Sequence, residues 1–177
     1  MDGDGLGATA NATAAREQAV KLEQLLVDDA RDGRPCGNQI APVGTLLPAA
    51  NEADDQATTV VQPDILAVCD PAKVTVNNIR GAPEWIIEVL SPATARRDHL
   101  TKRAQHEHAG VREYWLVHPT DRVITLYTLK DGLYGDPEIG EMAGERSPAI
   151  FPKVLIHWQA ILDKLPHDTA ASGNQNA

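Results

Sequence analysis

The chain has 177 residues, of which 42% are hydrophobic and 4% aromatic. That length fits one domain with a core of Val, Ile, Leu and Ala, which needs no disulfide or structural metal. The formal charge of −9 argues against a protein that coats nucleic acid non-specifically, because phosphate contacts need Lys and Arg. It does not exclude a nuclease, because clustered acids are what a hard metal ion requires.

The two cysteines, Cys36 and Cys69, lie in different segments and have no zinc-type spacing. We therefore expect two reduced thiols. No apolar run approaches the roughly 18 residues of a membrane span, and the first thirty residues lack the apolar core of a signal peptide. These features predict a cytoplasmic protein that does not contact a membrane.

Both ends of the chain differ in composition from its middle. Residues 1–13 and 167–177 are small, polar and rich in Gly or Asn, which is typical of disordered tails. We therefore expect one domain over residues 14–166. From Ala14 to Arg31, apolar residues recur at three- and four-residue steps, which predicts an amphipathic helix at the start of that domain.

The next part of the chain favours strands. The stretch Ile40–Pro48 predicts one strand, and Thr58–Asp70, rich in β-branched residues, predicts a second strand antiparallel to it. Pro83–Ser91 is apolar on both faces. It therefore predicts a central strand that is covered on both sides.

The second half of the domain mixes helix and strand signals. Thr94–Ala109 predicts a helix that ends at Gly110, a residue suited to the left-handed cap conformation. The stretches "REYWLVHP" and "RVITLYTLKDG" predict a hairpin around a polar turn. After a Gly- and Pro-rich stretch, "KVLIHWQAILDKL" predicts a short strand or turn that leads into a last helix. The order of elements predicts an α/β fold.

Two acidic residues stand out within these strands. Glu88 interrupts the apolar run from Trp85 to Leu90, and a buried carboxylate needs a protein cation, a metal ion or a wet edge position. Asp64 follows Pro63 in the preceding apolar strand. Two carboxylates on adjacent strands can share one Mg²⁺. A solvated acid beside a turn is the alternative interpretation of Asp64.

The helix that follows Glu88 brings charged groups near it. Asp98 and Lys102 are four residues apart and share a helix face, as do Lys102 and His106. Ordinary surface pairing is the alternative interpretation. His106 and His108 are two residues apart and do not face each other, so this pair does not predict a zinc site.

The start of the same helix carries the best local basic patch of the chain. Arg96 and Arg97 are adjacent there, and guanidinium groups bind the phosphates of a nucleic-acid backbone. Plain solubility is an equal alternative for this pair.

The stretch from Gln62 to Pro119, which contains "QPDILAV", "PEWIIEVLSP" and "VREYWLVHP", closely resembles the Uma2 family (DUF820) of restriction endonuclease-like proteins. That family is similar to the wider P-D…(D/E)-x-K nuclease superfamily. The resemblance continues more weakly from Ala15 to Leu165. It implies a restriction-endonuclease-like α/β fold, with a central mixed β-sheet flanked by helices.

The resemblance also assigns residues to a site. The superfamily carries an acid after a proline, an acid on the next strand and a lysine two residues later. The two acids match Asp64 and Glu88, but the third position is Leu90. In Uma2 proteins the lysine lies on the following helix, where Lys102 matches it, with Asp98 one turn earlier.

The implied activity is that of a metal-dependent endonuclease acting on nucleic acid, foremost DNA. Asp64, Glu88 and the backbone carbonyl of Val89 would bind Mg²⁺ or Mn²⁺. Lys102 would orient the attacking water or neutralise the charge of the pentacovalent phosphate. Nucleases of this type often act as dimers, and the apolar hairpin Glu113–Leu129 would offer a sheet edge for pairing or, equally, pack in the core.

Some positions depart from the family pattern. The usual N-terminal segment near "E-L-I-D-G-E" is replaced by "GDGLGATANATAAREQ", so an acid from that region would have to come from Glu17 or Glu23. The family's tyrosine on the helix is His106 here, and the aspartate after "YWLV" is His118. These departures favour an alternative, an inactive member that binds nucleic acid or dimerises. A metal phosphohydrolase acting on a small nucleotide is a third hypothesis.

Overall fold

The structure, a computed structural model, describes residues 37–40, 44–47, 56, 59–90 and 97–165, and the side chains of 37–40 and 97–99 are not described. The tails and the helix predicted over 14–31 lie outside these residues. The described strands are β1 (Gly37–Ile40), β2 (Gly44–Leu47), β3 (Thr59–Val61), β4 (Ile65–Val68), β5 (Asn78–Arg80), β6 (Trp85–Val89), β7 (Glu113–His118), β8 (Val123–Lys130), β9 (Leu133–Tyr134), β10 (Glu138–Glu141), β11 (Glu145–Arg146) and β12 (Ile156–His157). The described helices are η3 (Pro71–Lys73), α2 (Arg97–Ala109) and α3 (Trp158–Leu162).

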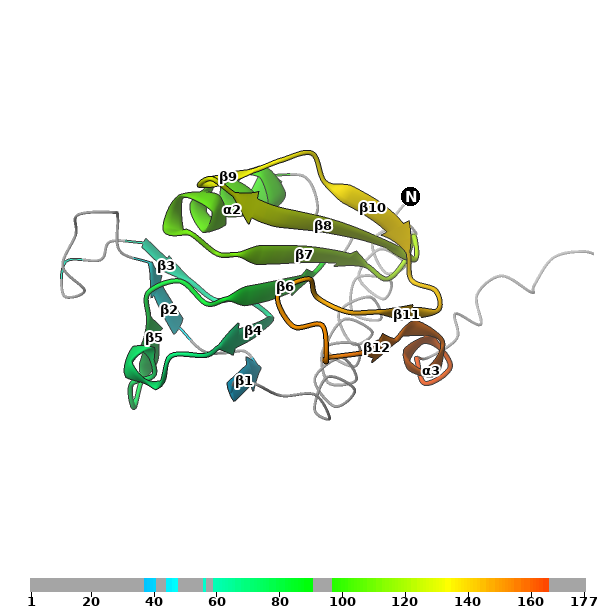
Figure 1. Ribbon diagram of the computed structural model, residues 1–177, viewed down its shortest axis with the longest axis horizontal. Helices are drawn as coiled ribbons and strands as arrows, with labels where there is room; N and C mark the ends of the chain where they lie inside the picture. The colour runs from blue at the N-terminus through cyan, green and yellow to red at the C-terminus, as the bar shows by residue number, and fades with distance from the viewer. Residues whose placement is uncertain (1–36, 41–43, 48–55, 57–58, 91–96, 166–177) are drawn as a thin grey trace, which may run out of the picture.

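A mixed sheet forms the centre of the molecule. Its strand order is β1-β4-β6-β7-β8-β10, and β9 pairs with β8. β6 and β7 are parallel, whereas the other pairs in this sheet are antiparallel. Figure 1 shows β6, β7, β8 and β10 side by side, with α2 near β9 and with β11, β12 and α3 at the other side of the view. Two smaller sheets, β3-β2-β5 and β11-β12, complete the described fold.

The two faces of the central sheet bury different side chains. One face packs against α3 through an apolar cluster that includes Trp85, Ile87, Trp115, Val117, Trp158 and Ile161. The other face carries Leu66, Ile86, Tyr114, Leu116 and Tyr127 and lies under α2, whose side chains contact Tyr114 and Tyr127. We call these the α3 face and the α2 face.

Strand β6 is the central strand that the sequence predicts. All five of its residues are buried, because β4 and β7 flank it and both faces of the sheet are covered. Side chains alternate between the faces of a strand. Ile87 therefore belongs to the α3 face, and Ile86 and Glu88 point to the α2 face.

The N-terminal strand predictions needed correction. Of the stretch predicted as one strand from Ile40 to Pro48, only Ile40 falls in β1 of the central sheet, and Gly44–Leu47 forms β2 of a separate sheet. Thr58–Asp70 is likewise two strands, β3 and β4, interrupted around Pro63, which has no amide hydrogen to donate to a ladder. The antiparallel pairing holds, but in two sheets: β2 with β3 and β1 with β4.

The second half follows the prediction more closely. Helix α2 ends at Ala109, and Gly110 has φ +88°, which fits the left-handed cap. β7 and β8 form the predicted hairpin, and β12 leads directly into α3. The sequence did not predict β9, β10 and β11. Because β10 pairs with β8 and β6 pairs with β7, the hairpin lies inside the sheet, which confirms packing in the core, the second of the two alternatives, and not an open edge.

The cysteine prediction is also corrected. Cys69 is disulfide-bonded, so the expectation of two reduced thiols fails, and the chain's other cysteine, Cys36, lies outside the described residues. A disulfide does not favour the cytoplasmic location that the sequence predicted. Within the described residues, no helix is both long and apolar enough to cross a membrane.

Candidate active site

Asp64 and Glu88 come together because of strand register. Asp64 directly precedes β4, and the next residue, Ile65, lies opposite Ile87 in the antiparallel pair of β4 and β6. Asp64 is therefore opposite Glu88, on the same face of the sheet. The backbone N–H of Val89 donates a 2.7 Å hydrogen bond to Asp64 Oδ2, which fixes the Asp64 carboxylate at this point.

Glu88 is buried in the α2 face, with 3% of its surface exposed. Lys102 Nζ lies 3.0 Å from Glu88 Oε2 and forms an ion pair with it. The other oxygen, Oε1, accepts no hydrogen bond within the described part of the chain. A buried carboxylate oxygen without a partner is costly unless a hydrogen-bond donor or a cation reaches it.

The pKa of Asp64 reports the closeness of the two acids. Burial is the largest cause that raises this pKa, and the negative charge of Glu88 is the next; together they bring it from 3.8 to about 6, against the Val89 hydrogen bond and the charge of Lys102. The negative charge of Glu88 therefore repels the charged form of the Asp64 carboxylate. A divalent cation between them would relieve that repulsion.

Helix α2 places Lys102 over this pair through polar contacts. Arg103 Cζ lies 5.0 Å from the centre of the Tyr127 ring, a cation–π contact, and its Nη2 donates to the Tyr134 carbonyl. Glu107 accepts a 2.6 Å hydrogen bond from the Tyr134 N–H. The helix is therefore anchored in one register by polar bonds to β8 and β9, which holds Lys102 beside Glu88.

Comparison with known proteins identifies the family. The sequence profile of Uma2, described as "Putative restriction endonuclease", matches residues 10–158. The chain belongs to the Uma2 family. No curated protein matches the sequence.

A solved structure supports the fold of this Uma2 protein. The chain is similar to "a putative nuclease belonging to DUF820 from Anabaena variabilis ATCC 29413", with a TM-score of 0.58 and 14% identity over 86% of this chain and 80% of that one. At this identity the likeness shows the fold alone. It confirms the predicted nuclease-type α/β fold, with a central mixed sheet and flanking helices.

The structure brings the three main predicted residues of this Uma2 protein together and leaves others untested. Asp64, Glu88 and Lys102 meet on the α2 face. The described contact of Val89 is made by its N–H, not by its carbonyl. Arg97 and Asp98 lie in the first turn of α2, but their side chains are not described, and Arg96, Glu17 and Glu23 lie outside the described residues.

The site also contains residues that the sequence analysis did not assign. His106 is fully buried, its Nε2 lies 3.9 Å from Glu88 Oε1, and its ring packs 4.8 Å from that of Tyr114. Burial, and next the charge of Glu88, raise the pKa of the Tyr114 hydroxyl. The sequence feature that could have placed His106 in the site is its four-residue spacing from Lys102. This spacing predicts that the two side chains share a helix face, but not which residues that face covers.

The described contacts of His108 and His118 do not include Asp64 or Glu88. His108 is exposed on α2 and lines a pocket of about 310 Å³ with Leu47 and Thr59, so His106 and His108 do not form a metal pair. At the end of β7, burial lowers the pKa of His118, partly offset by Asp121. A neutral His118 does not replace the charge of the family's aspartate.

Proposed function

We propose that this chain is a divalent-metal-dependent nuclease that hydrolyses phosphodiester bonds of nucleic acid, with DNA as its substrate. The observation that carries the proposal is the convergence of two carboxylates from adjacent strands, Asp64 and Glu88, with the ammonium group of Lys102 at 3.0 Å from Glu88. Family membership supports the class of reaction.

The side chains present fit a hard divalent ion. Asp64 and Glu88 supply oxygen ligands, and Glu88 Oε2 already binds a cation, the Lys102 ammonium group. No group of three His, Cys, Asp or Glu side chains that could hold a metal occurs in the described ranges. Two carboxylates suffice for Mg²⁺ or Mn²⁺, because such ions keep several waters and bind substrate phosphate. The Val89 carbonyl is the further oxygen ligand that we propose.

The protein groups divide the chemistry between them. When bound, the divalent ion polarises the scissile phosphate and acidifies water. Lys102, whose side chain is 35% exposed, is accessible enough to leave Glu88 and to contact the phosphate, where its positive charge stabilises the pentacovalent transition state. Asp98, one helical turn before Lys102, would support the orientation of that lysine.

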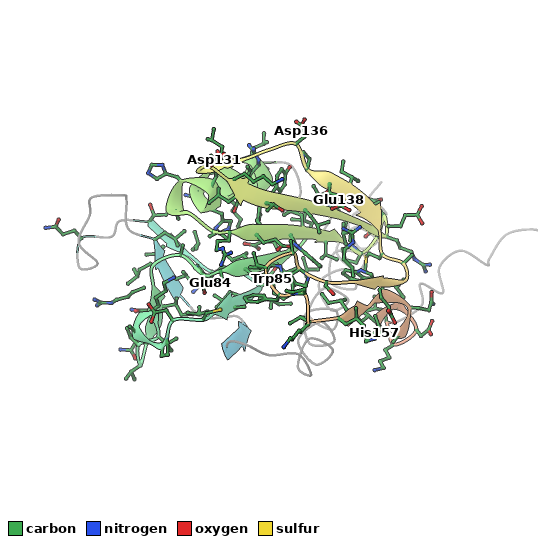
Figure 2. All side chains as sticks on the ribbon, in the orientation of Figure 1. Glu84, Trp85, Asp131, Asp136, Glu138 and His157 are labelled. Carbon is green, nitrogen blue, oxygen red and sulfur yellow. The ribbon has the colours of Figure 1, made fainter. Side chains whose placement is uncertain are left out.

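The charge distribution suggests where nucleic acid approaches. Figure 2 shows Asp131, Asp136 and Glu138 on the β8–β10 side of the molecule, where Glu138 is ion-paired with Arg146. Arg97 is the first residue of α2, the helix that carries Lys102, and Arg96 precedes it in the sequence. We propose that these two arginines bind the phosphate backbone and that the enzyme acts as a homodimer on duplex DNA. Glu17 or Glu23 would supply a supporting acid.

One observation favours a second candidate, a catalytically inactive family member that binds nucleic acid or dimerises. Only two acids, Asp64 and Glu88, gather at the site among the described residues, and the lysine position of the superfamily is Leu90. This candidate predicts binding of nucleic acid without cleavage.

The experiment incubates purified protein with supercoiled plasmid, linear DNA and RNA in Mg²⁺, Mn²⁺ or EDTA, beside a Glu88→Ala variant. We expect metal-dependent nicking or cleavage of DNA that EDTA and Glu88→Ala both abolish. Cleavage that survives either treatment would assign the activity to a contaminant or to another site. Binding without cleavage of any substrate would support the inactive candidate.

A further inference from the structure

A buried histidine behind Glu88 has no role in the reaction as proposed so far. His106 follows Lys102 by one turn of α2 and is 0% exposed. Its Nε2 lies 3.9 Å from Glu88 Oε1. Neither ring nitrogen of His106 nor Glu88 Oε1 has a hydrogen-bond partner among the described residues. A buried donor and a buried acceptor therefore face each other without yet forming a bond.

This arrangement has an energetic consequence. An N–H···O hydrogen bond has a length of about 2.9 Å, so a shift of the order of 1 Å in the Glu88 carboxylate would close the gap. Each buried polar group left unpaired lowers the stability of the folded state. Closing this contact satisfies both groups at once, provided that the Nε2 atom carries the hydrogen.

Packing alone does not account for a histidine at this position. The ring lies 4.8 Å from the Tyr114 ring at an interplanar angle of 55°, a contact that any aromatic ring would make. An apolar ring would leave no unpaired nitrogens in the core. A zinc ligand is not supported either, because His108 is exposed on another face of α2 and the described ranges hold no third ligand.

We propose that His106 is a positioning residue, which donates its Nε2–H to Glu88 Oε1 and so holds the carboxylate while Oε2 binds the divalent ion. This inference rests on the proposed function. Lys102 is the other group that holds Glu88, at Oε2, and it is needed at the phosphate. His106 then keeps the Glu88 side chain in place when Lys102 leaves.

The test measures binding of Mn²⁺ to the full-length chain in the absence of nucleic acid, by calorimetric titration and by electron paramagnetic resonance. His106→Gln keeps a side-chain N–H donor, and His106→Met has similar length without one. We expect His106→Met to weaken Mn²⁺ binding about 10- to 100-fold, as loss of a group that orients a metal ligand does. We expect His106→Gln to restore most of that affinity. His108→Met, an exposed change on the same helix, is the matched control and leaves the affinity unchanged.

Thermal unfolding of the metal-free variants separates positioning from a structural role. Met removes unpaired polar atoms from the core, so His106→Met folds at least as stably as His106→Gln while binding Mn²⁺ more weakly. Equal Mn²⁺ affinity in His106→Met, His106→Gln and wild type would overturn the inference, as would a wild-type protein that binds no Mn²⁺. A wild type that binds Mn²⁺ through Glu88 and cleaves nothing would contradict the nuclease proposal and leave this inference standing.

Discussion

Two glutamate–lysine pairs lie at opposite ends of β6, and both have an Nζ–Oε distance of 3.0 Å. Just before the strand, Glu84 binds Lys73 through Oε1 and accepts a 2.7 Å hydrogen bond from the Cys69 N–H at Oε2. Lys73 Nζ also donates to the Ala82 carbonyl. Every oxygen of this carboxylate has a protein partner, so the Glu84–Lys73 pair is closed.

The Glu88–Lys102 pair near the end of the strand is open. Glu88 is more deeply buried than Glu84, at 4% against 15% side-chain exposure, yet its Oε1 has no hydrogen-bond partner in the described part of the chain. A second carboxylate, Asp64, lies beside it. The two pairs show that an ion pair by itself does not indicate a functional site. A buried carboxylate oxygen without a hydrogen-bond partner, next to a second carboxylate, is the feature that does.

The largest expected effect separates the two glutamates by activity. Glu88→Gln removes a metal-ligand charge, and because a bound metal contributes several kcal/mol to transition-state stabilisation, we expect DNA cleavage to fall on the order of a thousandfold. Glu84→Gln, the matched change in the closed pair, should leave the cleavage rate within about twofold of wild type, as expected for a change away from the chemistry. Initial rates of plasmid nicking in Mg²⁺ measure both. Equal losses of cleavage rate in the two variants would show that the Glu88–Lys102 pair matters no more for cleavage than the Glu84–Lys73 pair.

The two lysines extend the comparison. Lys102→Met should lower the rate about 100-fold, the usual cost of removing one group that stabilises transition-state charge. Lys73→Met should leave the rate unchanged and lower the free energy of unfolding by about 1 kcal/mol, because the ion pair of Lys73 with Glu84 is partly exposed. Single-turnover cleavage and urea unfolding of the same preparations test this. A Lys102→Met enzyme with wild-type rate would remove Lys102 from the reaction.

The open pair should also destabilise the metal-free protein at neutral pH. The pKa of Asp64 is raised to about 6, so the folded state holds this proton more tightly than the unfolded chain does. Stability contributed by the protonated form is therefore lost as pH rises from about 4 to about 6. Asp64→Asn removes this titration, and its stability advantage over wild type should grow by on the order of 2 kcal/mol across that range.

Urea unfolding in EDTA at pH 4, 5, 6 and 7 measures that difference. Excess Mg²⁺ at pH 7 should then stabilise wild type but not Asp64→Asn, because a ligand stabilises only the state that binds it. A stability difference that does not depend on pH would contradict the proposed closeness of the two carboxylates.

The smallest expected effect concerns the closed pair. Glu84→Ala removes the acceptor for the Cys69 N–H and the partner of Lys73, which should lower the free energy of unfolding by about 1–2 kcal/mol. Cleavage by the folded fraction should not change. Thermal unfolding beside the nicking assay tests both statements, and a selective loss of cleavage would place Glu84 in the site after all.

The sequence predicted the elements that have a strong local signal. The run Trp85–Leu90, apolar except for Glu88, predicted a buried central strand, and the Gly110 cap predicted where α2 ends. The sequence-based prediction failed where the pairing of strands decides which sheet a segment joins. β1 and β2 are close in sequence but belong to different sheets, and no local pattern distinguishes one long strand from two short ones on different partners. The acid Glu88 could be singled out because a carboxylate in an apolar strand needs compensation.

By itself, the sequence determined that Asp64 and Glu88 lie in apolar segments and that Lys102 lies on the next helix, because these facts follow from local composition and periodicity. The tertiary structure alone decided that Asp64 faces Glu88, that Lys102 binds Oε2 rather than Oε1, and that His106 is buried behind them. Strand register and helix docking set these contacts, and both depend on partners that are distant in the chain. For the same reason, the Glu84–Lys73 and Glu88–Lys102 pairs consist of the same two residue types but differ in their three-dimensional surroundings.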